Sequence, residues 1–286
     1  MEGGWQHRRW TSAEGLRLHA RDYPAADGPA RLPVICLHGL TRNGRDFDAL
    51  APWIAARHRR VLAVDVRGRG LSDRDPAASY WLPTYADDVA RLAESLGLAR
   101  AIFIGTSMGG LITMQLAGMM PGLVAAAVIN DIGPELAPEG LTRIASYVGK
   151  APVLDGWDAA ALYLQQQNAA ALPHYRAEDW RRMAARMFRD EGGKVVADYD
   201  PAIATAFNTG PLLADPWDRW NGLAAARPVL LLRGGISDLL TAGDATRMVM
   251  EHAGALLREV PNVGHAPMLD EPEALAAIGQ FLDQLP

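Results

Sequence analysis

A short apolar run near the middle of the chain leads through a glycine-flanked serine directly into a helical pattern. Residues 101–104 read Ala-Ile-Phe-Ile, residues 105–109 read Gly-Thr-Ser-Met-Gly, and Leu111 to Met119 has helical spacing. The G-x-S-x-G motif in this setting predicts a sharp strand-to-helix turn with strained dihedral angles at Ser107. The residues two positions away must then be small. Such a turn presents the Ser107 hydroxyl at the carboxyl end of a strand, above the N-terminus of a helix.

Short apolar runs alternate with longer helical patterns along most of the chain, which predicts βαβ units. We therefore expect an α/β fold with a doubly wound, mostly parallel sheet flanked by helices. Leu16 and Leu18 alternate with charged residues and indicate an antiparallel hairpin at one sheet edge. Buried strands are expected at 34–37, 61–66, 101–104, 124–129, 229–232 and 256–260, and helices at about 46–56, 85–96, 108–119, 242–252 and 272–284.

The alternation stops between residues 133 and 220. This segment is rich in proline, contains helical stretches but no pattern of a core strand, and holds half of the chain's Trp, Tyr and Phe residues. We predict a helical cap, or lid, inserted after the sixth strand, with residues 1–132 and 221–286 forming the core. Most of its aromatic side chains should join the cap helices, and some should face a pocket. The candidates are Tyr147, Trp157, Tyr163, Trp180, Phe207, Trp217 and Trp220.

A nucleophilic serine needs a base, and the base needs an acid that orients it. His265 lies between the last predicted strand and the last predicted helix, where a base can reach Ser107. Two aspartates, Asp238 and Asp131, each follow a predicted strand and lie between the serine and the histidine in sequence. Both fit the chain order serine, acid, histidine. We favour Asp238, which lies beside a glycine-rich turn, and keep Asp131 as the alternative acid.

The loop after the strand at 34–37 reads His38-Gly39-Leu40-Thr41. Gly39 would allow the backbone to approach a substrate closely. The backbone amides of Leu40 and Met108 are therefore the expected pair of oxyanion donors. His38 competes with His265 for the role of base, but we expect it to brace this loop.

Composition excludes several other classes of site. The only cysteine among the 286 residues is Cys36, so neither an intrachain disulfide nor a cysteine zinc site is possible. The histidines are scattered, no His-Glu-x-x-His occurs, and no phosphate-binding glycine fingerprint is present. We therefore expect no metal and no cofactor.

Charge and hydropathy also limit the expected partners. The net charge is −5 and no basic stripe is present, which argues against nucleic acid binding. No uninterrupted apolar stretch of about 18 residues occurs to span a membrane. Met1 to Trp10 is polar, so we expect no signal peptide and a cytoplasmic location. Homo-oligomer formation remains open.

These motifs together resemble those of the α/β-hydrolase fold superfamily over nearly the whole chain. His38-Gly39, the 65–72 turn, the Ser107 turn, Asp238 and Gly264-His265 follow the order and approximate spacing of its esterase, lactonase and C–C hydrolase branch. The resemblance implies a Ser107–His265–Asp238 triad and a helical cap. A serine at the turn distinguishes the chain from epoxide hydrolases and haloalkane dehalogenases, which need a carboxylate nucleophile. The loop at Gly39 also lacks the His-Gly-Gly-Gly form of hormone-sensitive-lipase-like enzymes.

The expected function is that of a serine hydrolase cleaving carboxylic esters or lactones, with a small-molecule substrate and an acyl-enzyme on Ser107. Hydrolysis of a C–C bond in vinylogous diketones is an alternative, with Arg143 as a candidate for holding a substrate carboxylate. An acyltransferase and a low-turnover ligand receptor of the same fold are further alternatives.

Overall fold

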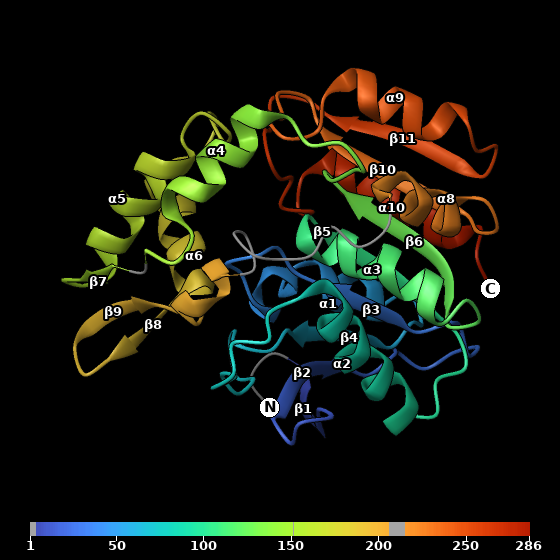
Figure 1. Ribbon diagram of the computed structural model, residues 1–286, viewed down its shortest axis with the longest axis horizontal. Helices are drawn as coiled ribbons and strands as arrows, with labels where there is room; N and C mark the ends of the chain where they lie inside the picture. Colours follow the sequence, from blue (N-terminus) through green and yellow to red (C-terminus); the bar gives the residue numbers. More distant parts are fainter. Residues whose placement is uncertain (1–3, 151, 206–214) are drawn as a thin grey trace.

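The computed structural model describes residues 4–150, 152–205 and 215–286. The candidate aromatic residue Phe207 lies outside these ranges. The centre of the structure is an eight-stranded sheet with the order β1-β2-β4-β3-β5-β6-β10-β11 (Figure 1). The strands of the sheet are β1 (Gln6–Thr11), β2 (Arg17–Tyr23), β3 (Val34–Leu37), β4 (Val61–Asp65), β5 (Ala101–Thr106), β6 (Val124–Asn130), β10 (Val229–Gly234) and β11 (Ala255–Val260).

The sheet is mostly parallel, as the alternating pattern predicts. β1 pairs antiparallel with β2 and β2 pairs antiparallel with β4, whereas every pair from β4 to β11 is parallel. The predicted edge hairpin is therefore confirmed. Helices cover both faces of the sheet, so β3, β4 and β10 are buried along their whole length. This double burial explains why their sequences are unbroken apolar runs rather than alternating ones.

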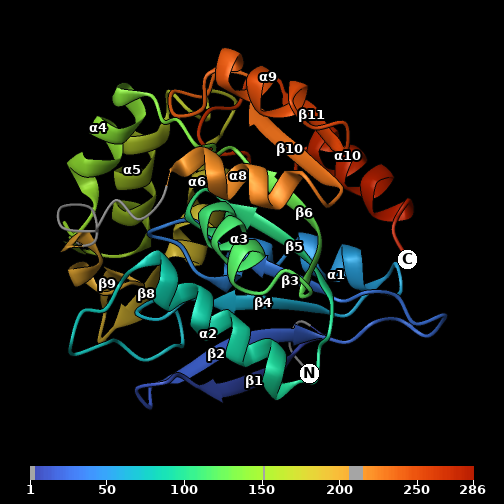
Figure 2. The same ribbon diagram turned by 45° about the vertical axis from the view of Figure 1, so that its right-hand side comes forward.

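Five of the core helices fall close to the predicted ranges, and the sixth, α8 (Pro216–Ala224), has no predicted counterpart. α2, α3 and α8 lie together on one face of the sheet, and α1 and α10 lie on the opposite face (Figure 2). In the three described ranges, no helix is long and apolar enough to cross a membrane. The core helices are α1 (Leu50–Ala55), α2 (Leu82–Ser95), α3 (Met108–Met119), α8 (Pro216–Ala224), α9 (Ala242–Met250) and α10 (Pro272–Asp283), with the 3₁₀ helix η2 (Gly44–Phe47) before α1.

The segment between β6 and α8 lies beside the carboxyl ends of the parallel strands (Figure 1). It contains the predicted helices and also an antiparallel sheet of order β7-β9-β8, which the sequence pattern did not predict. These strands are short and partly exposed, and therefore leave no apolar run in the sequence. The elements are α4 (Pro138–Tyr147), β7 (Val153–Leu154), α5 (Trp157–Asn168), α6 (Ala177–Met187), β8 (Phe188–Glu191), β9 (Lys194–Ala197) and η3 (Pro201–Ala204).

α8 begins within the predicted cap range of 133–220 and ends beyond it, and it packs against α3 of the core. Trp220 of α8 is fully buried, and its indole N–H donates to the backbone oxygen of Met248 in α9 at 2.9 Å. Because a large aromatic side chain is anchored between two core helices, α8 is part of the layer that covers the sheet.

Polar contacts attach the cap to the core. Arg45 in η2 pairs with Asp198 at 2.5 Å, and the Asn43 amide donates to the backbone oxygen of Arg186 at 2.9 Å. The Tyr80 hydroxyl donates to Asp200 at 2.6 Å. These contacts hold the cap over the edge of the sheet where β3, β5 and β6 end.

Candidate active site

Ser107 sits at the predicted sharp turn between β5 and α3. Its φ of 51° and ψ of −116° are strained for a non-glycine residue, as the motif requires. A Cβ at Gly105 would lie 2.4 Å from backbone atoms of Gly109, and a Cβ at Gly109 would lie 2.1 Å from the backbone oxygen of Leu37. Only glycine fits at either position. The G-x-S-x-G spacing is thus explained by the close packing of α3 against β5 and β3.

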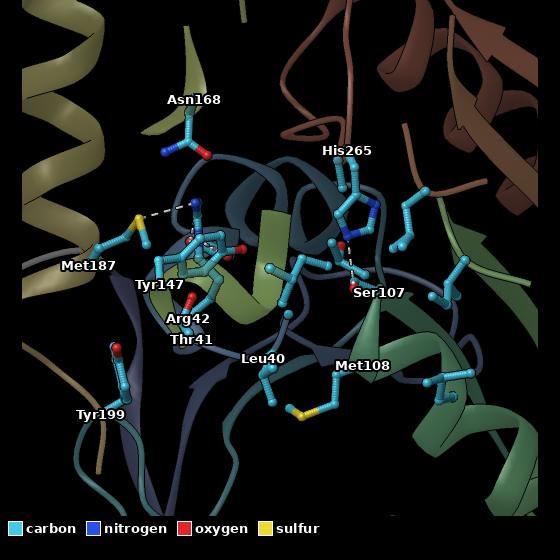
Figure 3. Close-up of a pocket in the computed structure, with 18 of the residues that line it drawn as sticks. Leu40, Thr41, Arg42, Ser107, Met108, Tyr147, Asn168, Met187, Tyr199 and His265 are labelled. Atoms are coloured by element: carbon cyan, nitrogen blue, oxygen red, sulfur yellow. Dashed lines mark hydrogen bonds and ion pairs between the residues drawn. The ribbon is translucent and has the colours of Figure 1, made fainter. Parts of the chain in front are cut away.

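His265 lies in the loop between β11 and α10, as predicted, and its side chain reaches Ser107 (Figure 3). The Nε2 atom is 3.0 Å from Ser107 Oγ, and Nδ1 is 2.9 Å from a carboxylate oxygen of Asp131. An ionised carboxylate only accepts hydrogen bonds, so Nδ1 carries the proton and Nε2 is free to accept one from the serine. The histidine side chain is 8% exposed, and its orientation is therefore well fixed.

The carboxylate against His265 belongs to Asp131 and not to Asp238. Asp131 is fully buried, and its oxygens also accept hydrogen bonds from the Gly234 amide at 2.8 Å and from the Ser237 hydroxyl at 2.7 Å. The preference for Asp238 as the hydrogen-bond partner of His265 is therefore wrong, and the alternative, Asp131, takes that position. The reason is strand order, because Asp131 follows β6, the direct neighbour of β5, whereas β10 lies one strand further away.

Asp238 instead faces the cap. Its carboxylate makes a two-point ion pair with Arg143 of α4, with nitrogen–oxygen distances of 2.6 and 2.8 Å. Burial raises the pKa of Asp238, but the hydrogen bonds and charge of Arg143 outweigh it and hold the pKa below its usual value. Arg143 is thus engaged in a contact between cap and core rather than offered to a substrate carboxylate.

Asn130, the last residue of β6, is buried beside the site and was not predicted. Its amide nitrogen donates to the Thr106 hydroxyl at 3.0 Å and to the backbone oxygen of Pro267 at 2.8 Å. It therefore connects the serine turn to the loop that carries His265. Its place at the end of a strand, directly before Asp131, was the signal that could have identified it.

The loop after β3 is held by His38, as expected. His38 Nε2 accepts from the Val66 amide at 3.1 Å, so Nδ1 carries the proton that it donates to the backbone oxygen of Gly39 at 2.7 Å. Burial lowers the pKa of His38 to about 4, so the imidazole is neutral and does not compete with His265 as a base. The anchored peptide group joins Gly39 to Leu40, and its N–H is the predicted oxyanion donor.

Leu40 and Met108 flank Ser107 at the base of the cavity (Figure 3). Arg69 is buried beneath them, and its Nε donates to the backbone oxygen of Leu40 at 3.0 Å. Met108 is the first residue of α3, and the first N–H groups of a helix have no partner within the helix. Both amides are therefore held next to the serine, and their role as oxyanion donors stays a prediction.

A cavity of about 670 Å³ lies between the core and the cap, with Ser107 and His265 in its wall. Most of the lining is apolar, contributed by the core and the cap alike. Polar side chains in the wall include those of Arg42, Tyr147 and Asn168 (Figure 3). The principal apolar lining residues are Leu111, Ile132, Leu136, Leu141, Ile144, Leu164, Leu172, Met183 and Met187.

The candidate aromatic residues divide as the sequence analysis expects, with some facing the cavity and others packing elsewhere. Tyr147 and Tyr163 line the cavity. Trp180 is buried within the cap, Trp220 is buried in the core, and Trp157 is 41% exposed on the surface of the cap. The Trp217 indole donates to Glu135 at 2.7 Å. Across the described ranges, no group of three or more His, Cys, Asp or Glu residues is arranged to hold a metal ion.

Comparison with known proteins places the chain among hydrolases. The model of the alpha/beta hydrolase family matches residues 34–278. A 3-hydroxybutyrate-oligomer hydrolase from Cupriavidus necator is 36% identical over 92% of this chain and 93% of its own. A 2-(acetamidomethylene)succinate hydrolase from Mesorhizobium japonicum is 29% identical over 87% of each chain. The crystal structure of an alpha/beta hydrolase from Novosphingobium aromaticivorans superposes with a TM-score of 0.92, at 43% identity over 99% of both chains.

The family match spans most of the chain, and the solved structure shares its complete architecture. The family match covers the serine turn, the cap between β6 and α8, and the loop of His265. The chain belongs to the alpha/beta hydrolase family.

Proposed function

We propose that the protein hydrolyses carboxylic esters through an acyl-enzyme on Ser107. The observation that carries this proposal is the continuous hydrogen-bonded chain from Ser107 through His265 to the buried carboxylate of Asp131. This order of nucleophile, base and orienting acid is what acyl transfer requires. The largely apolar cavity above it suits a small-molecule ester or lactone.

The geometry supports a two-step reaction. Ser107 Oγ attacks the ester carbonyl carbon while its proton passes to His265 Nε2. The amides of Leu40 and Met108 hold the oxyanion of the tetrahedral intermediate. The intermediate then collapses, the C–O bond to the alcohol breaks, and the alcohol leaves with the proton from His265. Water repeats the sequence on the acyl-enzyme and releases the acid and the free serine.

Asp131 acts throughout by orienting His265. It accepts the Nδ1 proton, which keeps Nε2 directed at Ser107 and stabilises the imidazolium that forms in each step. The buried donors from Gly234 and Ser237 keep Asp131 in place. One relative supports hydrolysis of oligoesters, because the Cupriavidus necator protein is named 3-hydroxybutyrate-oligomer hydrolase.

Labelling with a fluorophosphonate probe, combined with turnover of p-nitrophenyl butyrate, tests the proposal. We expect the probe to modify Ser107, as located by mass spectrometry of peptides. Ser107→Ala should abolish labelling and lower kcat/KM by at least about 10⁴-fold. Ser146→Ala, on the exposed surface of the cap, is the matched control and should leave both unchanged. Turnover by Ser107→Ala at the wild-type rate would overturn the proposal.

A further inference from the structure

Arg42 is a charged residue inside the cavity that the triad and the oxyanion loop do not use. It follows Leu40 and Thr41 in the turn after β3 and lines the cavity wall (Figure 3). A Cβ built on Gly39 would meet Arg42 Cγ at 3.5 Å and Ser107 Cβ at 3.8 Å. The stem of the arginine and the nucleophile therefore both lie close to Gly39, and the guanidinium lines the same cavity.

One edge of the Arg42 guanidinium is fixed by Asp46 of η2. Nε lies 2.9 and 2.8 Å from the two carboxylate oxygens, and Nη2 lies 2.8 Å from one of them. Both side chains are largely buried. Burial lowers the pKa of Arg42, but Asp46 outweighs it and holds the pKa above its ordinary value, so the charge is retained. Asp46 thus sets the plane in which the guanidinium lies.

At the other edge of Arg42, Nη1 and the second N–H of Nη2 have sulfur acceptors, while the first N–H of Nη2 donates to Asp46. Nη1 lies 3.2 Å from Met187 Sδ, and Nη2 lies 3.5 Å from Met268 Sδ. A thioether is a weak acceptor, so two donors of a buried cation remain poorly satisfied. Met187 belongs to the end of α6 and Met268 to the loop of His265, and both line the cavity. This edge of the guanidinium therefore faces the space that a substrate would occupy.

We propose that the Nη1–Nη2 edge of Arg42 binds a free carboxylate on the ester substrate, an inference that rests on the proposed function. Two parallel N–H groups match the two oxygens of a carboxylate, and such paired bonds are the strongest that arginine makes. Asp46 binds the Nε–Nη2 edge, and the Met187 and Met268 thioethers at this edge are weak acceptors on flexible side chains that a carboxylate can displace. A single guanidinium can then join both carboxylates. The substrate class is then a hydroxy-acid ester or short oligoester that ends in a free acid.

Two substrates that differ only at their end test this inference. One is the linear dimer of 3-hydroxybutyric acid with a free carboxylate, and the other is the same dimer ending in a primary amide. Wild-type protein should prefer the acid in kcat/KM. Arg42→Met combined with Asp46→Asn removes both charges together, and the ratio of acid to amide should fall by between about 10- and 100-fold, mainly through KM.

The control variant makes the same two substitutions in an ion pair that lies away from the cavity. Arg91 and Asp87 form an exposed ion pair four residues apart on α2, like Arg42 and Asp46. Arg91→Met combined with Asp87→Asn should leave the ratio unchanged. Arg42→Lys retains the charge but not the two-nitrogen edge, and it should keep only part of the preference. If the Arg42→Met, Asp46→Asn double variant fails to fold, Arg42→Lys provides the test.

Each outcome decides between the inference and the proposed function. The inference is overturned if the substitutions at Arg42 leave the acid-to-amide ratio of kcat/KM unchanged. This includes the case in which kcat/KM falls equally on both dimers. A wild-type protein that is labelled at Ser107 but hydrolyses neither dimer also overturns the inference alone. Absence of labelling at Ser107 overturns the proposed function.

Discussion

Two aspartates follow neighbouring strands of the sheet, and their carboxylates differ in burial and in hydrogen-bond partners. Asp131, after β6, is fully buried and receives hydrogen bonds from the core and from His265. Asp238, after β10, is 36% exposed at its side chain and pairs with Arg143 of the cap. The same residue type at the same edge of the sheet thus orients a histidine in one loop and connects cap to core in the other.

Burial and the number of fixed donors distinguish the two regions. Burial of a carboxylate is costly unless it is hydrogen-bonded, and the Asp131 carboxylate contacts Gly234, Ser237 and His265. That dense network also fixes the position of His265. Asp238 has one cationic partner and remains in contact with water, so its ion pair is worth little to stability. Buried polar groups of the core should therefore have large effects when altered, and the cap contact should have small ones.

His38 provides the largest stability effect expected from this comparison. Its folded-state pKa of about 4 lies below the unfolded value of about 6.5, so the unfolded chain binds more protons between these values. The free energy of unfolding should therefore fall as pH decreases from about 6.5 to 4.5, with His38 contributing about 2 to 3 kcal/mol. Urea unfolding of wild type and His38→Gln over this range measures that contribution.

The slope of stability against pH should be smaller in His38→Gln, which lacks the titrating group. Equal slopes in the two proteins would show that protonation of His38 does not oppose folding. Such a result would weaken the contrast between buried core groups and the cap contact.

The Arg143–Asp238 pair should give the smallest effect. Arg143→Met should lower the free energy of unfolding by less than about 1 kcal/mol, because the pair is partly exposed. Hydrogen exchange in α4 should become faster, since one contact between cap and core is lost. Arg181→Met, which removes an exposed ion pair with Asp158 within the cap, is the control. A loss above about 3 kcal/mol would place the pair among the buried core interactions.

Much of the fold could be predicted from the sequence because both faces of the sheet are covered. Strands such as β3 then appear as continuous apolar runs, and α3 begins immediately after Ser107. The serine and the histidine could be placed because each belongs to a distinctive loop at a strand end. The short strands of the cap left no such pattern and were missed.

The acid that contacts His265 and the position of Arg42 in the cavity could be identified only from the structure. Two aspartates satisfied the sequence pattern, and the choice depended on which strand lies next to β5. The order of the strands in the sheet is not visible in the chain order. Arg42 appeared as one of many scattered arginines, because its contacts come from Met187 and Met268, far away in sequence.

The most direct test of the account is the kcat/KM of Asp131→Asn and Asp238→Asn on the same p-nitrophenyl ester. An asparagine at position 131 cannot hold the required tautomer of His265, so we predict a loss of about 10³- to 10⁴-fold. Asp238→Asn should lose less than tenfold, because it alters only the contact with Arg143. A loss for Asp238→Asn that equals or exceeds that for Asp131→Asn would contradict the assignment of Asp131 as the acid that orients His265.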